Sequence, residues 1–273
     1  MNDELLKQLA QQILETFDVK DQEKFEQEAR QLDQELLRNK ISPHLHQWFM
    51  EGDPVCAGEN FVIIRSWQQD LIKNNPKYEG RKTILIDPGI SFGWAHPTTL
   101  LPLELLEKHW NGGCLLDIGT GTGILAIAAA LLQPNATMDA FDISLDIVEN
   151  AKSHLEINGV LDKIKIQCAD ITNYEPHAYD LITANLLPDI FFLIKEDIVK
   201  RLKPGGKLIM SGFSDKAESR TIANFDWLPT VSELSSDKQS DVCLMFQDLG
   251  LQLVEKVHMK DWVGLVMIAP KNQ

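Results

Sequence analysis

Short runs rich in β-branched residues alternate with longer amphipathic runs along most of this 273-residue chain. Strands joined by crossover helices lie parallel, so the alternation predicts an α/β fold with a doubly wound, mostly parallel sheet. The run at 250–270 breaks the pattern, because it is typical of a strand, a tight turn at Lys260–Asp261 and a second strand. We therefore expect the sheet to end in an antiparallel C-terminal hairpin. The other predicted strands are at 60–67, 82–89, 114–118, 137–143, 163–168, 179–184 and 206–212, and the predicted helices are at 100–110, 123–132, 145–158 and 189–203.

Two regions stand apart from this alternation. Residues 1–50 carry apolar side chains at helical spacing with polar residues between them, which predicts a helical N-terminal appendage. The rest of the chain, 51–273, is predicted to be one domain that opens with a β segment over 51–90. Within that domain, residues 217–240 form a polar stretch too long for a simple connection, so we expect an insertion or lid there.

Composition and charge limit the partners, the cellular location and the metal sites that we expect for this protein. The net charge of −14 disfavours direct contact with nucleic acid, and it either favours a basic partner or serves only solubility. No apolar run reaches the ~18 residues of a membrane helix, and the acidic start lacks the apolar stretch of a secretory signal. The four cysteines are widely spaced, as expected for reduced thiols in a cytoplasmic protein. His44 and His46 lack acidic or cysteine partners at ligand spacing, so no metal site is expected. The sequence does not predict an oligomeric state.

The stretch LLDIGTGTG, at 115–123, leaves a predicted strand and enters a predicted helix. Its glycines, Gly119, Gly121 and Gly123, allow a tight turn and a close approach of the backbone to a ligand. A purely structural turn would also explain such a loop. The spacing G-x-G-x-G places Ile124 where the dinucleotide fingerprint requires glycine, which disfavours an NAD-dependent dehydrogenase.

Two carboxylates indicate the chemistry of the ligand. Asp117 stands two residues before the first glycine, where its charge would repel a pyrophosphate and suit a cationic amine. Asp142 closes the next predicted strand, where a carboxylate can accept hydrogen bonds from both hydroxyls of a ribose. The expected ligand has a ribose, a positive charge and no phosphate. S-adenosyl-L-methionine fits this description.

These motifs resemble those of class I S-adenosylmethionine-dependent methyltransferases. DIGTGTG resembles their first motif, FDIS the second, CADI the third and ANLLP the fourth. The resemblance implies a Rossmann-like, seven-stranded sheet and S-adenosyl-L-methionine as the cofactor. It also implies that Gly119 and Gly121 meet the methionine part, that Asp142 binds the ribose, and that Asp170 faces the adenine amino group.

The stretch DPGISFGWAHPTT, at 87–99, narrows the resemblance to the ribosomal protein L11 methyltransferases, whose signature is roughly D-P-G-x-x-F-G-T-G-x-H-P-T-T. In that family the last threonine contacts the cofactor, which implies this role for Thr99, and the asparagine of the fourth motif, here Asn185, is implied to be a cofactor-binding residue as well. His96 can cap the next helix and Pro97 can occupy its first turn. The stretch is therefore expected to cover the cofactor pocket, and the alternative is that it merely begins a helix.

Asn185 is also the candidate catalytic residue. Its side-chain carbonyl could hold a neutral amine without ionising, while Leu186, Leu187 and Pro188 keep the site apolar. The expected reaction is methylation of an amine of a protein, on a lysine or an α-amine, and no general base is assigned. Two alternatives stay open: a methyltransferase for a small molecule or peptide, and a relic of the fold that binds the cofactor or a partner without catalysis.

Three features depart from the L11 pattern. Trp94–Ala95 replaces a longer segment, Pro102 is expected to bend the following helix, and residues 1–50 are predicted to be helical where the family has a small α/β module. The cofactor residues are kept while these acceptor-side features change. We therefore expect L11 to be a poor acceptor, and another amine to be held in a partly closed pocket that includes Trp94 and Trp227. The alternative is an ordinary L11 methyltransferase whose loops have changed without effect on the substrate.

Overall fold

The computed structural model describes residues 53–87, 91, 94, 96–174, 178–214 and 238–271. Apart from residue 53, they lie in one compact unit of the chain, residues 54–218 with 231–273. The predicted appendage at 1–50 lies outside the described residues, as do His44, His46, Trp227 and nearly all of the predicted insertion at 217–240.

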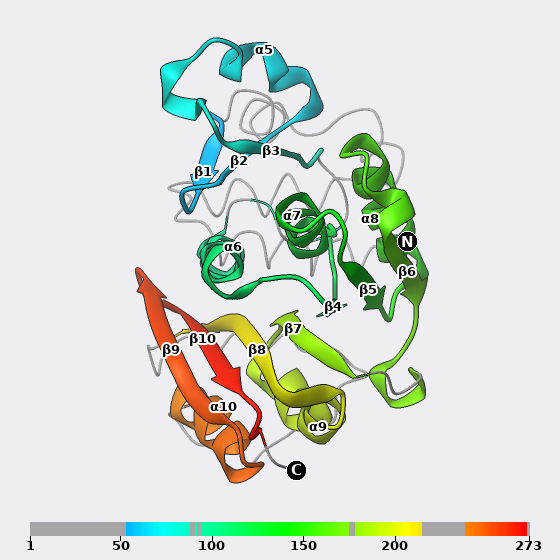
Figure 1. The fold of residues 1–273 in the computed structure, drawn as a ribbon, viewed down its shortest axis with the longest axis vertical. Helices are drawn as coiled ribbons and strands as arrows, with labels where there is room; N and C mark the ends of the chain where they lie inside the picture. The colour runs from blue at the N-terminus through cyan, green and yellow to red at the C-terminus, as the bar shows by residue number, and fades with distance from the viewer. Residues whose placement is uncertain are drawn as a thin grey trace, which may run out of the picture. The chain divides into compact units, whose positions relative to one another are not determined.

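A seven-stranded sheet organises this unit, in the order β6-β5-β4-β7-β8-β10-β9 (Figure 1). The strands from β6 to β8 are parallel to their neighbours, whereas β10 pairs antiparallel with both β8 and β9. The predicted fold class and C-terminal hairpin are therefore confirmed. The strands are β4 (Cys114–Ile118), β5 (Thr137–Asp142), β6 (Ile164–Cys168), β7 (Tyr179–Asn185), β8 (Leu202–Ser214), β9 (Gln252–Met259) and β10 (Trp262–Ile268).

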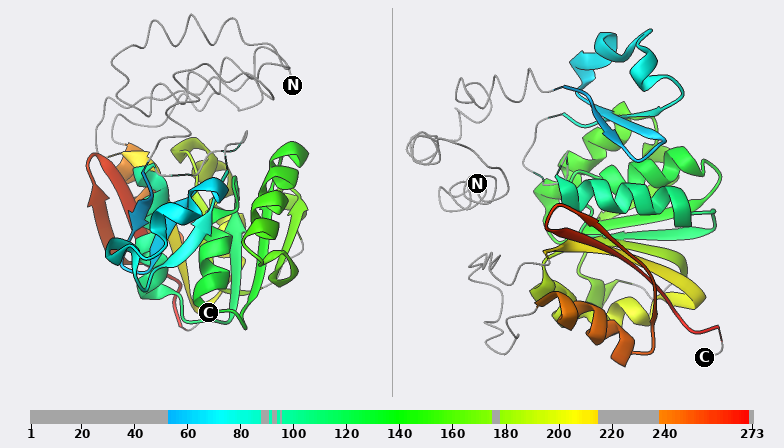
Figure 2. Two further views of the ribbon diagram at one scale, coloured as in Figure 1. Left: turned by 90° about the horizontal axis from the view of Figure 1, so that it is seen from above. Right: turned by 90° about the vertical axis from the view of Figure 1, so that its left-hand side faces the viewer.

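Helices cover both faces of the sheet, as expected for a doubly wound fold (Figures 1 and 2). One face carries α6 (Pro97–His109), α7 (Ile124–Leu132) and α8 (Leu145–Ile157), and the other carries α9 (Pro188–Val199) and α10 (Lys238–Asp248). α10 was not predicted; it begins inside the stretch expected to be an insertion. Among the described residues, no helix has the length and apolar character needed to cross a membrane.

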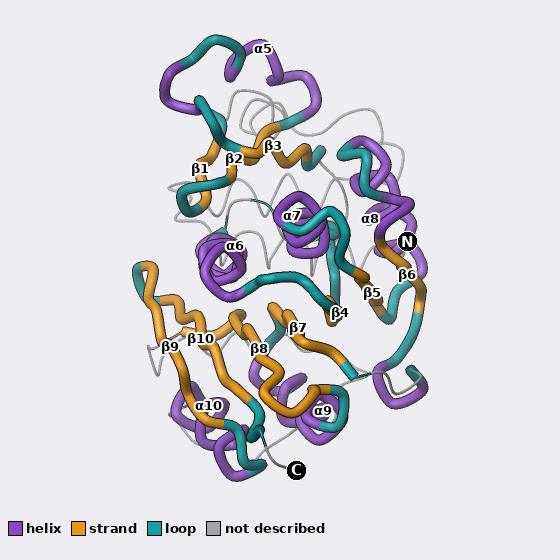
Figure 3. The backbone as a smooth tube through the Cα atoms, viewed as in Figure 1, coloured by secondary structure: helices purple, strands orange, loops and turns teal. Residues whose placement is uncertain are grey.

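A small sheet of three strands packs on the α6 and α7 side (Figure 3). β1 (Val55–Ala57) pairs antiparallel with β2 (Phe61–Ile64), and β2 pairs parallel with β3 (Lys82–Leu85). The short helix α5 (Gln69–Ile72) and two 3-10 turns, η1 (Ser66–Gln68) and η2 (Pro76–Tyr78), connect β2 to β3. Two further 3-10 turns, η3 (Leu161–Lys163) and η4 (Ile171–Asn173), precede and follow β6.

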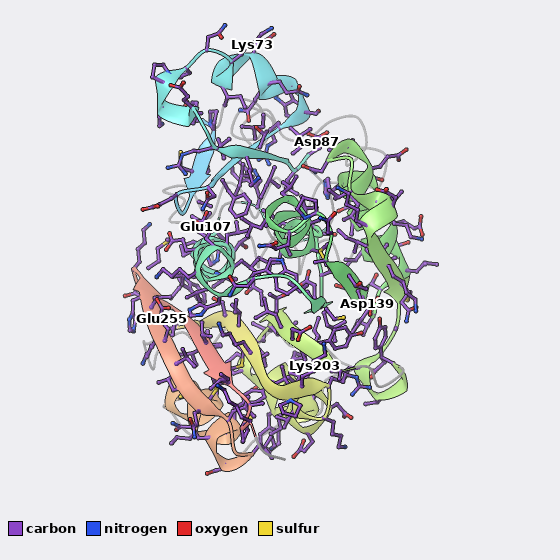
Figure 4. All side chains as sticks on the ribbon, in the orientation of Figure 1. Lys73, Asp87, Glu107, Asp139, Lys203 and Glu255 are labelled. Atoms are coloured by element: carbon purple, nitrogen blue, oxygen red, sulfur yellow. The ribbon has the colours of Figure 1, made fainter. Side chains whose placement is uncertain are left out.

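Glu107 fixes the small sheet to α6. Its carboxylate accepts hydrogen bonds from the backbone nitrogens of Glu59 and Asn60, at 2.9 and 2.8 Å, in the turn between β1 and β2 (Figure 4). A carboxylate that accepts two backbone N–H groups holds a tight turn in place. Glu107 therefore ties the turn between β1 and β2 to α6.

The core follows the side-chain alternation of strands that are buried on both faces. Leu115 and Leu181 join the apolar cluster under α6 and α7, while their neighbours Leu116 and Ile182 join the cluster under α9 and α10. Pro102 lies within α6, and the helix continues through it to His109. A proline this near a helix start removes only one hydrogen bond, so the helix persists on its buried packing.

Candidate functional site

The carboxyl ends of four neighbouring strands carry the predicted site residues. Gly119 follows β4, Asp142 ends β5, Asp170 follows β6 and Asn185 ends β7. The chain order of the strands reverses between β4 and β7, which makes this edge the topological switch point of the sheet. Ligands of open α/β sheets bind in the crevice outside such a point. The fold thus gathers residues at one edge that are far apart in the sequence.

The loop between β4 and α7 has a backbone shape that requires glycine. The φ angle is 64° at Gly119, 56° at Gly121 and 82° at Gly123, in the left-handed region. A Cβ on Gly119 would lie 2.6 Å from Cδ2 of Leu186, and one on Gly123 would lie 2.7 Å from Cδ1 of Leu155. A side chain at either position would strain the backbone and displace a neighbour, so the glycines keep the loop tight against β7 and α8.

Asp117 lies beneath this loop. It is 1% exposed; Oδ1 accepts a 2.7 Å hydrogen bond from Thr183 Oγ1, and Oδ2 accepts one of 2.7 Å from Thr120 Oγ1. Burial raises the pKa of Asp117 to about 6; the two threonine hydroxyls oppose this rise and the charge of Asp142 adds to it. Asp117 therefore holds the loop to β7, and its predicted contact with a cofactor stays a prediction.

Asp142 is tied directly to the glycine loop. Its Oδ2 accepts from the backbone nitrogen of Gly121 at 3.2 Å, and its Oδ1 accepts from that of Ser144 at 3.3 Å. Burial raises the pKa of this carboxyl, while the backbone N–H groups lower it. The residue is 8% exposed, and the backbone N–H groups of Gly121, Ser144 and Ile143 leave one of the four carboxylate lone pairs for a ligand. This arrangement suits the predicted role of a ribose-binding acid.

An exposed isoleucine beside this acid was missed by the sequence analysis. Ile143 is 54% exposed although it follows a buried strand. The backbone nitrogen of Ala169 donates to the Asp142 carbonyl at 2.9 Å, so the segment after β6 runs alongside. Asp170 is exposed there, and its Oδ1 accepts from Thr172 N at 2.8 Å. An exposed apolar side chain next to a ribose-binding acid is suited to packing against the flat ring of a nucleobase. The contact of Asp170 with adenine stays a prediction.

Asn185 ends β7 next to the glycine loop, because β7 pairs with β4. Its side chain is half-buried, and within the described part of the chain its amide has no hydrogen-bond partner. The following residue, Leu186, reaches over Gly119, and its backbone nitrogen donates to the Ser211 carbonyl at 3.0 Å. The asparagine is thus fixed by its backbone while its amide is available to a ligand.

The 87–99 stretch ends in the first turn of α6, with the cap that its sequence predicts. His96 is the N-cap residue, its Nδ1 accepts from Thr98 N at 3.3 Å, and Pro97 takes the first helical position. Burial lowers the pKa of His96 to about 4, as does the charge of Lys260, so the ring stays neutral and able to accept. Thr99 is 0% exposed, and among the described residues its Oγ1 has no hydrogen-bond partner. A buried hydroxyl without a partner is costly, and the predicted contact of Thr99 with a cofactor stays a prediction.

Trp94 is anchored by the small sheet. The Cζ atom of Arg65 lies 3.6 Å from the centroid of the Trp94 ring, which is a close cation–π contact. Arg65 is buried and donates from Nη1 to the Ile86 carbonyl at 3.1 Å. The expectation that Trp94 lines an acceptor pocket stays a prediction.

The described residues contain no group of three or more His, Cys, Asp or Glu side chains suited to hold a metal ion. All four cysteines are free.

Comparison with known proteins adds independent findings. The family described as "Ribosomal protein L11 methyltransferase (PrmA)" matches residues 7–227. A ribosomal protein L11 methyltransferase of Exiguobacterium sp. is 31% identical over 223 residues, which cover 81% of this chain and 63% of the relative. Another, of Citrifermentans bemidjiense, is 36% identical over 212 residues, which cover 74% and 66%. The crystal structure of ribosomal protein L11 methylase from Lactobacillus delbrueckii subsp. bulgaricus shares the fold, with a TM-score of 0.65 and 24% identity over 80% of this chain and 98% of that one.

These matches cover only part of the relatives, and they include most of the predicted site residues. The chain spans a little under two thirds of the length of the two curated relatives, 63% and 66%. The family match begins at residue 7, so it includes most of the segment predicted to be a helical appendage. It also contains the glycine loop, Asp142 and Asn185, and it ends at residue 227, before β9 and β10.

Proposed function

The chain belongs to the ribosomal protein L11 methyltransferase family, and on that premise we propose that it is an S-adenosyl-L-methionine-dependent methyltransferase acting on an amine of a protein. The observation that carries this proposal is the pairing of the glycine loop with Asp142, whose Oδ2 accepts from Gly121 N at 3.2 Å. A ribose acid fixed to a glycine loop suits an adenosyl ligand. A second carboxylate, Asp117, is buried beneath that loop, where its charge would disfavour a polyphosphate and favour a cation nearby.

The residues at this edge fit S-adenosyl-L-methionine in four respects. The Asp142 oxygens would accept from the ribose hydroxyls, and exposed Ile143 would pack on the adenine. The backbone at Gly119 and Gly121 would approach the methionine part, because neither glycine carries a side chain of its own and both have a positive φ. The buried hydroxyl of Thr99, which has no partner in the described structure, would gain one from the methionine carboxylate.

Methyl transfer to an amine requires the protein mainly to align the acceptor nitrogen with the methyl group. When bound, the cofactor supplies a methyl group already activated on a positively charged sulfur. An acceptor amine must be neutral to attack, and the apolar wall that Leu186 begins favours the neutral form. The amide oxygen of Asn185 would accept a hydrogen bond from that amine and orient its lone pair without ionising itself. In this proposal Asn185 is the catalytic residue, because it touches the reacting nitrogen.

The family of the chain favours a protein amine over a small-molecule amine. Ribosomal protein L11 is the substrate named for the relatives, so it is the first acceptor to assay. The expectation that L11 is a poor acceptor stays a prediction, since the shortened stretch around Trp94 still departs from the family signature. A cytoplasmic setting belongs to the same proposal and agrees with four free thiols.

Calorimetry with S-adenosyl-L-methionine, S-adenosylhomocysteine and NAD tests the cofactor. We expect binding of the first two and none of NAD; the reverse pattern would exclude the proposal. Methyl-labelled cofactor is then given to the pure protein with purified L11 and, separately, with a cell extract. Label in a protein band supports a protein amine, whereas label only in small molecules supports the alternative. Rapid, multiple methylation of L11 would overturn the prediction that it is a poor acceptor.

A further inference from the structure

The sequence contains two Asn-Gly pairs, Asn111–Gly112 and Asn158–Gly159. In such a pair the backbone nitrogen of the glycine can attack the side-chain amide carbon of the asparagine, because glycine has no Cβ to hinder the approach. The reaction requires an asparagine side chain that is free to turn toward this nitrogen, and a glycine N–H that no acceptor holds. The structure places the two pairs in opposite states in both respects.

Hydrogen bonds hold the whole of the Asn158–Gly159 pair. Asn158 Oδ1 accepts from the backbone nitrogen of Leu85 at 2.9 Å, and Asn158 Nδ2 donates to the carbonyl oxygens of Leu85 and His154, both at 2.7 Å. The backbone nitrogen of Gly159 donates to the Glu156 carbonyl at 2.9 Å. The attacked group and the attacking group are therefore both engaged, although Gly159 itself is exposed.

The Asn111–Gly112 pair lies in the connection between α6 and β4, where neither group is engaged (Figure 1). Asn111 is exposed, and among the residues that the structure describes its side chain has no hydrogen-bond partner. The backbone nitrogen of Gly112 has no acceptor in that part of the chain either. A Cβ on Gly112 would meet only the Gln133 side chain, at 3.7 Å, so little surrounds this glycine.

Both flanks of this free pair are fixed. Trp110 is 3% exposed, and its Nε1 donates to the Ala129 carbonyl at 3.0 Å. The Gly113 carbonyl accepts from the backbone nitrogen of Thr137 at 2.9 Å. Water and hydroxide therefore reach the pair while its surroundings keep their native contacts, so a reaction there requires no unfolding.

We propose that Asn111 is a site of spontaneous deamidation in the folded protein, and that Asn158 is protected from it. The Gly112 nitrogen loses its proton to hydroxide and forms a bond to Asn111 Cγ. The bond from Cγ to Nδ2 then breaks and ammonia leaves with a proton from water, which gives a cyclic succinimide. Water opens the ring at either carbonyl and gives aspartate or isoaspartate. The reaction consumes one water, releases one ammonia and involves no oxidation or reduction.

Either product adds one negative charge to the net −14 of the chain, and isoaspartate also lengthens the main chain by one carbon between the two fixed flanks. Asn111 precedes β4, whereas the glycine loop follows it. The five residues of β4, at about 3.3 Å each, separate the two positions. The modification therefore lies at the edge of the sheet opposite the candidate functional site, and the inference does not depend on the proposed function.

Ageing of the whole protein at mildly alkaline pH, followed by peptide mass spectrometry, tests the proposal. Replacement of the amide by a carboxyl raises the mass of the peptide, and chromatography separates isoaspartate from aspartate. In the folded protein we expect conversion at Asn111 to be at least about 10-fold faster than at Asn158, because several hydrogen bonds must open first at Asn158. Equal rates at the two positions, or a faster rate at Asn158, would overturn the proposal.

The same protein aged in concentrated urea is the reference, because unfolding frees both pairs. We expect both asparagines to convert there at similar rates. If the difference between them were as large in urea as in the folded protein, the local sequence would set it, and the protection of Asn158 would be refuted. An Asn111 that converts in urea but not in the folded protein would equally refute the site.

Asn111→Gln is the matched variant. It keeps an exposed amide in a place where the side chain has no partner among the described residues, so the fold should be unaffected. Its longer side chain would have to close a larger ring, which is much slower. We expect the variant to lose the conversion in this peptide and to keep the wild-type rate at Asn158. Continued conversion of the peptide would assign the modification to another residue and so contradict the proposal.

Discussion

Thr183 donates a 2.7 Å hydrogen bond from Oγ1 to Oδ1 of Asp117, across the switch point between β7 and β4. Both residues are buried, and Thr120 supplies the second oxygen with its own donor from within the glycine loop. An ionised carboxylate without such donors would be strongly unfavourable in this place. The shape of the loop therefore depends on a hydroxyl that the neighbouring strand provides.

Removing that hydroxyl should destabilise the protein. Thr183→Val keeps the shape of the side chain but leaves one buried carboxylate oxygen without its donor, which we expect to cost about 1.5–3 kcal/mol in the free energy of unfolding at pH 8. Urea unfolding measures the loss. Thr183→Ser retains the donor and is the matched control, so an equal loss in both variants would show that the methyl packing matters and the hydrogen bond does not.

The stability of the protein should depend on pH through Asp117. Burial raises its pKa from 3.8 to about 6, so between these values the folded protein keeps a proton that the unfolded chain has released. The stability contributed by this group is fully present below about pH 4 and is lost as the pH rises to about 6. Relative to Asp117→Asn, the wild type should lose up to about 3 kcal/mol across this window. Urea unfolding of both proteins along the window measures the difference, and a difference that does not vary with pH would contradict the assignment.

Asp142→Ala should weaken cofactor binding. Loss of hydrogen bonds to a charged group predicts a decrease of about 1.5–3 kcal/mol in the binding free energy of S-adenosylhomocysteine, measured by calorimetry. Asp146→Ala removes an exposed carboxylate a few residues away and should leave the affinity nearly unchanged. An unaltered dissociation constant in folded Asp142→Ala would mean that the ribose is held elsewhere.

Thr99→Val should separate stability from binding. The buried Thr99 hydroxyl has no partner within the described structure, so its removal should leave the stability of the ligand-free protein unchanged or raise it by up to about 1 kcal/mol. Affinity for S-adenosylhomocysteine should fall by about 3- to 10-fold if the hydroxyl meets the ligand. Thr98→Val gives the opposite expectation, because Thr98 Oγ1 lies 2.8 Å from His96 Nδ1 and its loss should lower stability. Tight binding by Thr99→Val would remove Thr99 from the cofactor site.

Asn185→Ala should lower kcat by about 100-fold, the scale on which misplacement of a reacting group acts. The rate is measured on the acceptor that the labelling experiment identifies. Asn185→Asp keeps the shape and introduces a charge that would hold the protonated amine, so its rate should recover as the pH rises. A normal kcat in Asn185→Ala would show that this residue has no catalytic role.

The sequence alone determined the elements of the central sheet and the chemistry of its edge. Periodicity located β4 at its observed ends, and it located α7 and α8 to within a residue of theirs, because alternation and helical spacing are local properties of the chain. The glycine loop and the acid that ends β5 were also predicted from the sequence, because a backbone with positive φ requires glycine and the end of a strand is visible in the local sequence pattern. The C-terminal hairpin followed from a two-residue turn, where Lys260 adopts a φ of 55°.

Only the tertiary structure decided which groups meet. The sequence around Asp117 does not predict its hydrogen bond with Thr183. The sequence around His154 does not predict that its ring nitrogens lie beside the carbonyl oxygens of Asp87 and Thr122. These contacts join segments far apart in the chain, so they depend on strand order and on how α8 packs beside the small sheet. Sequence periodicity reports which face of an element is buried but carries no information about what lies opposite it. For the same reason the sequence did not predict that Asp117 lies beneath the loop, where burial raises its pKa and two threonine hydroxyls lower it.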